Sequence, residues 1–306
     1  MKHRMASSRT IGVTMGDPLG IGAEIILKAL SRWKGRSSIK VFGDPHLLKE
    51  LPRGELQPIS LGSSGRKPTA EEAGQASVAY LDAAMAAWRS GGIDALVTAP
   101  IAKHHVNLAG FPFPGHTEYL AAQTKTEKFA MMMAGPKLKV TLVTIHEPLK
   151  RVPELLSVAK ILETIEITHR ALRERFGIAK PRLAVCGLNP HAGEEGLLGR
   201  EEIELIAPAI AEARRRGFDC AGPKVPDAVF HEAYQGNWDA LVCMYHDQGL
   251  IPFKMVHFAD GVNVTLGLPL VRTSPDHGTA FDIAGQGKAD PSSMIAALKL
   301  AEEMLG

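Results

Sequence analysis

Three histidines stand at or just past the ends of separate apolar, β-branched stretches. His146 closes KVTLVTIH, His191 follows RLAVCGLN, and His246 closes DALVCMYH. If these stretches are parallel strands, their carboxyl ends meet at one edge of a sheet, where ligands gather in open α/β proteins. Converging imidazoles suit a divalent ion such as zinc, with positions left open for a substrate. The separations of 45 and 55 residues match no local metal motif, so three independent loop histidines are the alternative.

The stretch YHDQGLIPFK, residues 245–254, gathers further polar side chains directly after a buried run, among them Asp247 and Lys254. Taken alone, it is explained well by a polar strand end that turns into a loop. The same arrangement recurs at the other two strand ends, and this recurrence favours a site.

The elements that must position these residues alternate between short β-branched runs and longer helical patterns. This alternation predicts an α/β fold with mostly parallel strands and crossover helices on both faces of the sheet. The expected strands are RTIGVTM, SIKVFG, DALVTA, KFAMMMAG, KVTLVTIH, RLAVCGLN and DALVCMYH, and the main expected helices lie within 69–91, 158–177 and 199–217.

Composition excludes several functional classes. The chain has 306 residues and a formal net charge of +2, so there is no bulk electrostatic case for binding nucleic acid. No run approaches the roughly 18 to 20 apolar residues of a membrane span. Three cysteines cannot all form pairs with one another, and they lie far apart in the sequence without a C-x-x-C motif. We expect a cytoplasmic protein with no membrane partner.

Six motifs, in order along the chain, carry a family resemblance: VTMGDPLGIGAEI, FPGHTEYLA, VTIHEPLK, GLNPHAGE, YHDQGLIPFK and GVNVTLGLPLVRTSPDHGTAFDIAG. Together they resemble the 4-hydroxythreonine-4-phosphate dehydrogenase family of vitamin B6 synthesis. The resemblance implies two α/β/α lobes with a cleft between them, similar to the isocitrate and isopropylmalate dehydrogenases. The lobes are expected at 1–115 plus 270–306 and at 116–269.

The family's activity implies metal-dependent oxidation of 4-phosphohydroxy-L-threonine by NAD or NADP, with loss of carbon dioxide from the β-keto acid product. Relatives oxidise four-carbon phosphorylated sugar acids or cyclic diols, and 4-phosphothreonate and 4-phosphoerythronate are therefore alternative substrates. Three residues depart from the usual pattern: Leu19, Ala23 and Pro275. They bear on substrate or cofactor preference, not on the reaction class.

The resemblance also implies roles for individual residues. The metal ligands would be His146, His191 and His246, which would hold zinc, magnesium or cobalt. The substrate contacts would be His116, Thr117, Lys254, Asn263 and Arg272, with Lys254 and Arg272 clamping the phosphate. Asp227 and Asp247 are the acid–base candidates, although Asp247 could instead orient a ligating histidine. Thr117 could instead cap a helix, and the role of His277 stays open.

The nicotinamide site has the weakest signal, because no G-x-G-x-x-G is present. The related dehydrogenases bind the cofactor without that fingerprint. Gly16, Gly20, Gly22 and Gly278 lie in glycine loops that could form cleft walls, with structural turns as the alternative.

The family also implies a homodimer with active sites shared between the subunits. On this reading, His146 and His191 close neighbouring strands of one chain, and His246 opens a long loop, DQGLIPFKMVHFADG, and completes the partner's site. Phe253, Met255 and Phe258 would be exposed on that loop and contact the partner. A monomer with the loop on its own cleft is the alternative.

Two rival functions belong to other classes. Three histidines and a phosphate clamp would also serve a metal-dependent lyase or hydrolase. A two-lobed α/β protein could also bind a small molecule without catalysis.

Overall fold

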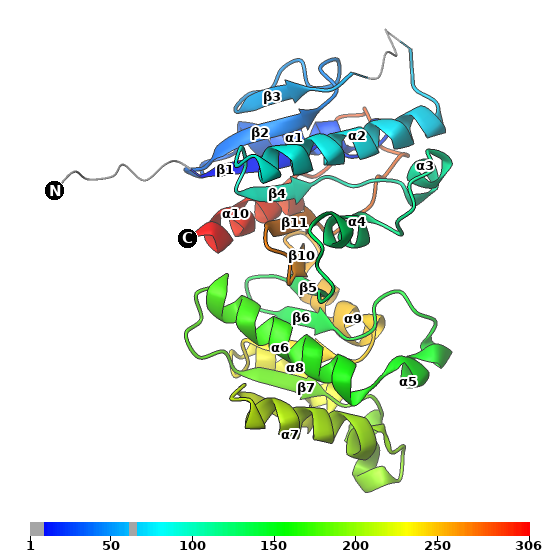
Figure 1. Ribbon diagram of the computed structural model, residues 1–306, viewed down its shortest axis with the longest axis vertical. Coiled ribbons are helices and arrows are strands. Elements are labelled where there is room, and N and C mark those ends of the chain that lie inside the picture. Colours follow the sequence, from blue (N-terminus) through cyan, green and yellow to red (C-terminus); the bar gives the residue numbers. More distant parts are fainter. Residues whose placement is uncertain (1–8, 61–65) are drawn as a thin grey trace, which may run out of the picture. The chain divides into compact units, whose positions relative to one another are not determined.

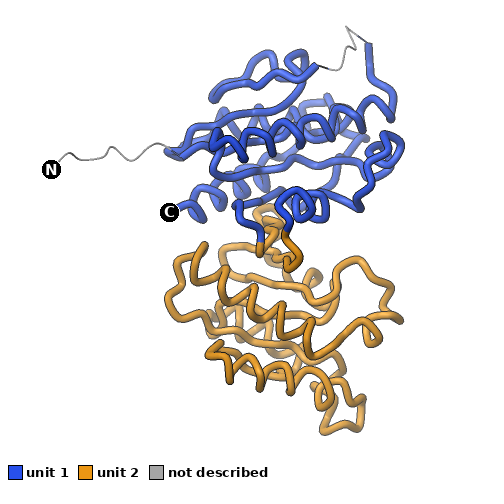
Figure 2. Tube along the Cα trace, viewed as in Figure 1, with its two compact units in different colours: residues 1–125, 268–306 blue, residues 126–267 orange. Residues whose placement is uncertain are grey.

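The computed structural model describes residues 9–60 and 66–306. The chain forms two compact units, unit 1 from residues 1–125 with 268–306 and unit 2 from residues 126–267 (Figure 2). The expected boundary at residue 116 would have placed helix α4 (His116–Gln123) in the second lobe. It belongs to unit 1 because its Tyr119 donates a hydrogen bond to Asp82 of helix α2 and packs on Phe111.

Unit 1 contains a parallel sheet in the order β3-β2-β1-β4-β11. Helix α2 packs against β1 and β2, and α1 packs with α10 (Figure 1). The strands are β1 (Thr10–Thr14), β2 (Ser38–Gly43), β3 (Glu55–Pro58), β4 (Ala95–Thr98) and β11 (Val271–Pro275), and the helices are α1 (Gly22–Ser31), α2 (Ala70–Arg89), α3 (Lys103–Leu108), α4 and α10 (Ser292–Leu305).

Unit 2 contains strands in the order β10-β5-β6-β9-β7-β8. The pairs β10–β5 and β5–β6 are antiparallel, because a turn of four residues joins β5 to β6, and the remaining pairs are parallel. The strands are β5 (Ala130–Ala134), β6 (Lys139–Leu142), β7 (Leu183–Cys186), β8 (Cys220–Lys224), β9 (Ala240–Cys243) and β10 (Val262–Leu266).

The helices of unit 2 cover its sheet (Figure 1). Helices α8 and α9 share a core with the sheet, and α6 packs on α7. The helices are α5 (Val152–Leu155), α6 (Val158–Glu174), α7 (Ala207–Arg215), α8 (Pro226–Tyr234) and α9 (His246–His257), with short segments η1 (Leu149–Arg151), η2 (Pro190–Gly196) and η3 (Glu202–Ile206).

The predicted α/β class with mostly parallel strands is confirmed, and each of the seven expected strands contains an observed one. Strands β3, β8, β10 and β11 were not predicted. The sequence of β8, CAGPK, shows why: it has no alternating or continuous apolar pattern, and four of its five residues are only partly buried. Its place in the sheet comes from pairing with β7.

The segment after His246 was expected to be a long loop, and this expectation is wrong for residues 246–257. They form α9 although Gly249 and Pro252 are poor helix formers. The helix forms because it buries one side on the core, where Phe253 is completely buried rather than exposed. Met255 and Phe258 are exposed, at 84% and 81%.

None of the helices in the described residues is both long enough and apolar enough to cross a membrane. The three cysteines are free thiols, and all three are buried.

Candidate functional site

Strands β6, β9 and β7 are neighbours and run parallel, so their carboxyl ends lie at one edge of the unit 2 sheet. His146 follows β6, His246 is the first residue of α9 directly beyond β9, and His191 follows β7. The structure differs from the expectation in one respect. β6 and β7 are not neighbours, because β9 lies between them, and the neighbouring strand ends are those of His146 and His246.

The side chains of His146 and His246 lie together in one chain. Their ring centroids are 5.6 Å apart, and the rings are tilted by 40°. Nδ1 of His246 lies 2.7 Å from Oδ1 of Asp247. A carboxylate on one ring nitrogen fixes the tautomer and leaves Nε2 for a ligand. The contact is compatible with the orienting role of Asp247, one of the two roles that the sequence left open.

His191 does not join this pair. Its side chain is exposed in η2, and its Nδ1 is 3.9 Å from Glu194. No group of three His, Cys, Asp or Glu side chains in residues 9–60 and 66–306 is placed to hold a metal ion. One chain therefore presents two adjacent imidazoles at the sheet edge, and this donor pair fits a divalent ion that takes its third protein ligand from elsewhere.

Three other expected site residues belong to unit 2. Lys254 is partly buried on α9, eight residues after His246. Asn263 lies on β10, and its Oδ1 is buried without a hydrogen-bond partner among the described residues. A buried amide oxygen without a partner favours a ligand or water contact there. Asp227 is exposed in the first turn of α8.

The remaining expected substrate residues belong to unit 1. Arg272 on β11 is 3% exposed and donates from Nη2 to Oγ1 of Thr98 at 2.7 Å. Burial lowers the pKa of Arg272 to about 10, an effect that the charge of Glu118 opposes. Arg272 thus remains a cation at neutral pH. A buried guanidinium at the carboxyl end of strand β4 is suited to an anionic group.

His116 and Thr117 are the first two residues of α4, whose N-cap is Gly115. The alternative role of Thr117 as helix cap is therefore wrong. Burial, and then the charge of Arg272, hold the pKa of His116 well below its usual value. Its Nε2 is buried without a hydrogen-bond partner in the described part of the chain. A neutral imidazole beside Arg272 can exchange hydrogen bonds with a ligand.

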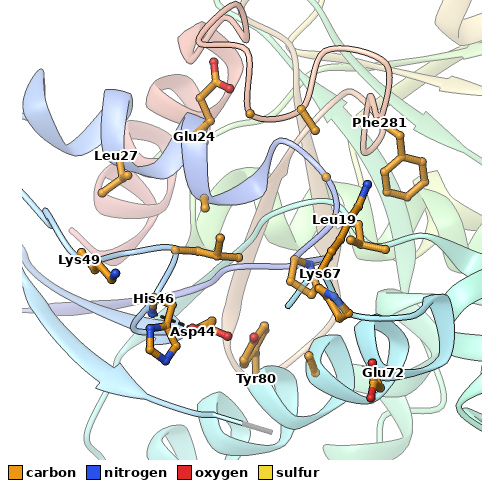
Figure 3. A pocket seen from close by; sticks show the side chains of 18 of the residues that line it. Leu19, Glu24, Leu27, Asp44, His46, Lys49, Lys67, Glu72, Tyr80 and Phe281 are labelled. Carbon is orange, nitrogen blue, oxygen red and sulfur yellow. Dashed lines mark hydrogen bonds between the residues drawn. The ribbon is translucent and has the colours of Figure 1, made fainter. Parts of the chain in front are cut away.

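Unit 1 also contains a cavity of about 760 Å³ (Figure 3). The loop between β1 and α1 forms one wall through Leu19 and Gly20, and the loop around Phe281 forms another. The two loops touch, since the N–H of Ile21 donates to the carbonyl of Thr279 at 3.0 Å. A Cβ on Gly20 would stand 2.9 Å from that carbonyl oxygen, so this close approach requires glycine.

The other glycines suggested for the cofactor have different surroundings. Gly16 has φ +73°, and a Cβ there would meet the carbonyl oxygen of Pro100, which makes it a turn glycine. Gly22 begins α1 and is buried. Gly278 is exposed. None of these three lines the cavity, whereas Gly20 does.

Most of the polar residues that line the cavity were not predicted from the sequence. Asp44, His46 and Lys49 follow β2, Lys67 precedes α2, and Glu72 lies in the first turn of α2 (Figure 3). One signal was available: Asp44 stands directly after the carboxyl end of β2, where ligands gather in α/β sheets.

A buried acid–imidazole pair lies next to the same loop and was also missed. Oδ2 of Asp17, which is completely buried, is 2.6 Å from Nδ1 of His105. The His105 ring is 5.1 Å from that of Phe281, and Asp17 accepts the N–H of Leu19 at 2.9 Å. The pair thus fixes both loops that wall the cavity.

The chain is similar to known proteins over most of its length. Residues 24–301 match the family described as pyridoxal phosphate biosynthetic protein PdxA. The chain is 49% identical to 4-hydroxythreonine-4-phosphate dehydrogenase of Desulfosudis oleivorans, over 95% of this chain and 94% of that protein. Its identity to the Desulforapulum autotrophicum protein of the same name is 47%, with the same coverage.

A solved structure is similar over nearly the whole chain. The crystal structure of 4-hydroxythreonine-4-phosphate dehydrogenase from Klebsiella pneumoniae matches with a TM-score of 0.88 and 41% identity, over 98% of this chain and 99% of that one. Sequence and fold therefore agree over nearly the full length. The chain belongs to the PdxA family of pyridoxal phosphate biosynthetic proteins.

Proposed function

We propose that the protein oxidises 4-phosphohydroxy-L-threonine with NAD or NADP to 2-amino-3-oxo-4-phosphooxybutanoate. Loss of carbon dioxide then gives 3-amino-2-oxopropyl phosphate, in the synthesis of pyridoxal 5'-phosphate. The observation that carries the proposal is the His146–His246 pair at the strand edge of a chain from this family. The free cysteines fit a reducing cytoplasm.

His146, His191 and His246 would hold one divalent ion, either zinc, magnesium or cobalt. Bound there, the ion would supply Lewis-acid chemistry to the substrate hydroxyl and to the ketone formed from it. Neutral imidazoles leave the ion its full charge. Asp247 would serve this arrangement by holding Nδ1 of His246, which leaves Nε2 of that ring for the ion.

The substrate phosphate needs cations. We assign it to Arg272 and Lys254, where Arg272 offers a planar fork and Lys254 a point charge. His116, Thr117 and Asn263 would bind the remaining polar groups of the substrate. The support comes from His116 Nε2 and Asn263 Oδ1, which are buried without hydrogen-bond partners in the described residues.

Asp227 is the better candidate for the general base. Asp247 already contacts His246, and an orienting carboxylate is a poor proton acceptor for the substrate. Asp227 is exposed in the first turn of α8, at the N-terminal end of the helix. As an exposed carboxylate, it would be able to pass a proton taken from the alcohol on to water.

We assign the nicotinamide cofactor to the cavity in unit 1. Its volume of about 760 Å³ suits a large part of a dinucleotide, and residues of the β1–α1 loop line it. Of the glycines suggested from the sequence, Gly20 is the one on this wall, and Gly16, Gly22 and Gly278 would support the loops behind it. Bound there, the cofactor would supply the acceptor for the hydride that leaves the substrate carbon.

The protein is proposed to act as a homodimer with shared sites. Ile251 and Met255 of α9 and its C-cap residue Phe258 are exposed, at a spacing of four and three residues. Such a stripe on one side of a helix is typical of an interface. Because one chain pairs His146 with His246, we propose that the third imidazole is His191 of the partner subunit. This differs from the arrangement expected from the sequence, in which His246 crosses over.

The test is a dehydrogenase assay on purified protein with a zinc salt. 4-Phosphohydroxy-L-threonine should reduce NAD or NADP faster than 4-phosphothreonate or 4-phosphoerythronate do. If one of those acids is the better substrate, the reaction class stands but the substrate is different, and Leu19, Ala23 and Pro275 become the residues to exchange. Release of phosphate or cleavage without cofactor reduction would instead show a hydrolase or lyase.

A further inference from the structure

The loop that carries His191 is held at its start by a buried carboxylate. Glu202 is 3% exposed and accepts hydrogen bonds from the backbone N–H groups of Leu188 at 2.7 Å and Asn189 at 2.8 Å. Nδ2 of Asn189 donates a third, at 3.0 Å. Burial raises the pKa of Glu202, but these donors outweigh it and leave the pKa below its ordinary value. The carboxylate is therefore charged, and hydrogen-bond donors of the loop contact both of its oxygens.

The backbone of the same loop closes around Glu202. A Cβ at Gly187 would lie 3.1 Å from Oε1 of Glu202, and one at Gly193 would lie 2.6 Å from its Oε2. Gly193 has φ +80°, within a run of positive φ from residue 191 to residue 195. The chain thus contacts this carboxylate both before and after His191.

A second buried side chain ties the loop to the helix that carries His246. Gln248 is 8% exposed and donates from Nε2 to the carbonyl of Gly187 at 2.6 Å. Its Oε1 accepts the N–H of Met244 at 2.7 Å. The amide therefore links the end of β7 to the junction of β9 and α9.

We propose that Glu202 and Gln248 are positioning residues that set where the His191 loop leaves the sheet relative to the His146–His246 pair. The inference rests on the proposed metal site and extends it to two residues that do not bind the ion. If the glycine-containing loop became ordered only when the metal binds, the conformational entropy lost would weaken the affinity for the metal. Glu202 and Gln248 order it beforehand, whichever subunit's site His191 completes.

Titration of metal-free protein with Co²⁺ alone tests this. Glu202→Gln keeps the size of the side chain and removes its charge. The matched control is Glu201→Gln, because Glu201 accepts a hydrogen bond from the Asn189 side chain alone, at 2.8 Å. We expect Glu202→Gln to weaken Co²⁺ binding by about tenfold or more and Glu201→Gln to change it by less than about twofold. Amide exchange in residues 187–196 should be faster in Glu202→Gln.

The outcomes separate the two proposals. If the wild-type protein and Glu202→Gln bind Co²⁺ equally, or if only the melting temperature falls, the positioning role is overturned and the metal site stands. If the wild-type protein binds no Co²⁺, both are overturned. Should Glu202→Gln fail to fold, Gln248→Glu replaces it, because it keeps the acceptor for Met244 and loses the donor to Gly187. It must show the same loss of affinity, and unchanged affinity would overturn the inference.

Discussion

Substitution of single residues tests the proposed phosphate contacts of Arg272 and Lys254. Arg272→Lys keeps a cation but loses the planar fork, and Lys254→Ala removes a charge. Each change should raise KM for the phosphorylated substrate and so lower kcat/KM. The loss corresponds to roughly 2–3 kcal/mol of transition-state binding per lost charged hydrogen bond. Steady-state kinetics measure this, with exposed Lys150→Ala as a control that leaves KM unchanged. Unchanged kinetics in both site variants would place the phosphate elsewhere.

His116 makes stability depend on pH. Burial and the charge of Arg272 hold its pKa well below the ordinary value of 6.5 in the folded protein. As pH falls below about 6.5, the unfolded chain binds a proton there that the folded chain does not, so the free energy of unfolding decreases. His116→Asn should therefore lose less stability between about pH 7.5 and 5.5 in urea unfolding. An identical loss in both proteins would contradict this origin.

Seven of the eleven strands in the described residues were predictable from local sequence, but the order of the strands in the sheet was not. Apolar patterns located β6, β7 and β9, and this placed three histidines at strand ends. Local pattern carries no information on which strands pair, so the position of β9 between β6 and β7 was missed, and with it the His146–His246 pair. Helix α9 was missed because Gly249 and Pro252 weaken local propensity while tertiary packing imposes the helix.

Packing of α9 on the sheet gives a test at the level of the element. In a helix, alanine normally stabilises the folded state relative to glycine by up to about 1 kcal/mol. At Gly249, however, a Cβ would lie 2.5 Å from Cγ1 of Val140 and 3.0 Å from Cδ2 of Leu142. Gly249→Ala should therefore destabilise the protein by about 1–3 kcal/mol in chemical unfolding. The control Gln75→Ala, on the exposed side of α2, should stay within about 0.5 kcal/mol. A more stable Gly249→Ala would show that α9 does not pack this closely.

At the scale of the whole molecule, subunit mixing distinguishes the possible arrangements of the shared site. If the partner's His191 joins His146 and His246 of one chain, a mixed dimer of His146→Ala and His191→Ala contains one intact site. Random exchange makes half the dimers mixed, so roughly a quarter of the wild-type activity should return.

The mixture of His146→Ala with His246→Ala should stay inactive, because each mutant chain then lacks one histidine of its own His146–His246 pair. Activity in this second mixture, with none in the first, would show that His246 is the residue that crosses over. No rescue in either mixture, after verified exchange, would place all three histidines in one subunit.

Metal dependence of the oxidation is measured most directly by counting both products in a single reaction. With 4-phosphohydroxy-L-threonine and zinc-loaded protein, each turnover should yield one reduced nicotinamide and one carbon dioxide. Protein stripped by a chelator should yield neither until a divalent ion is restored, and His146→Ala should not recover with the ion. Full nicotinamide reduction by the stripped protein would contradict a metal-dependent oxidation at the histidine site.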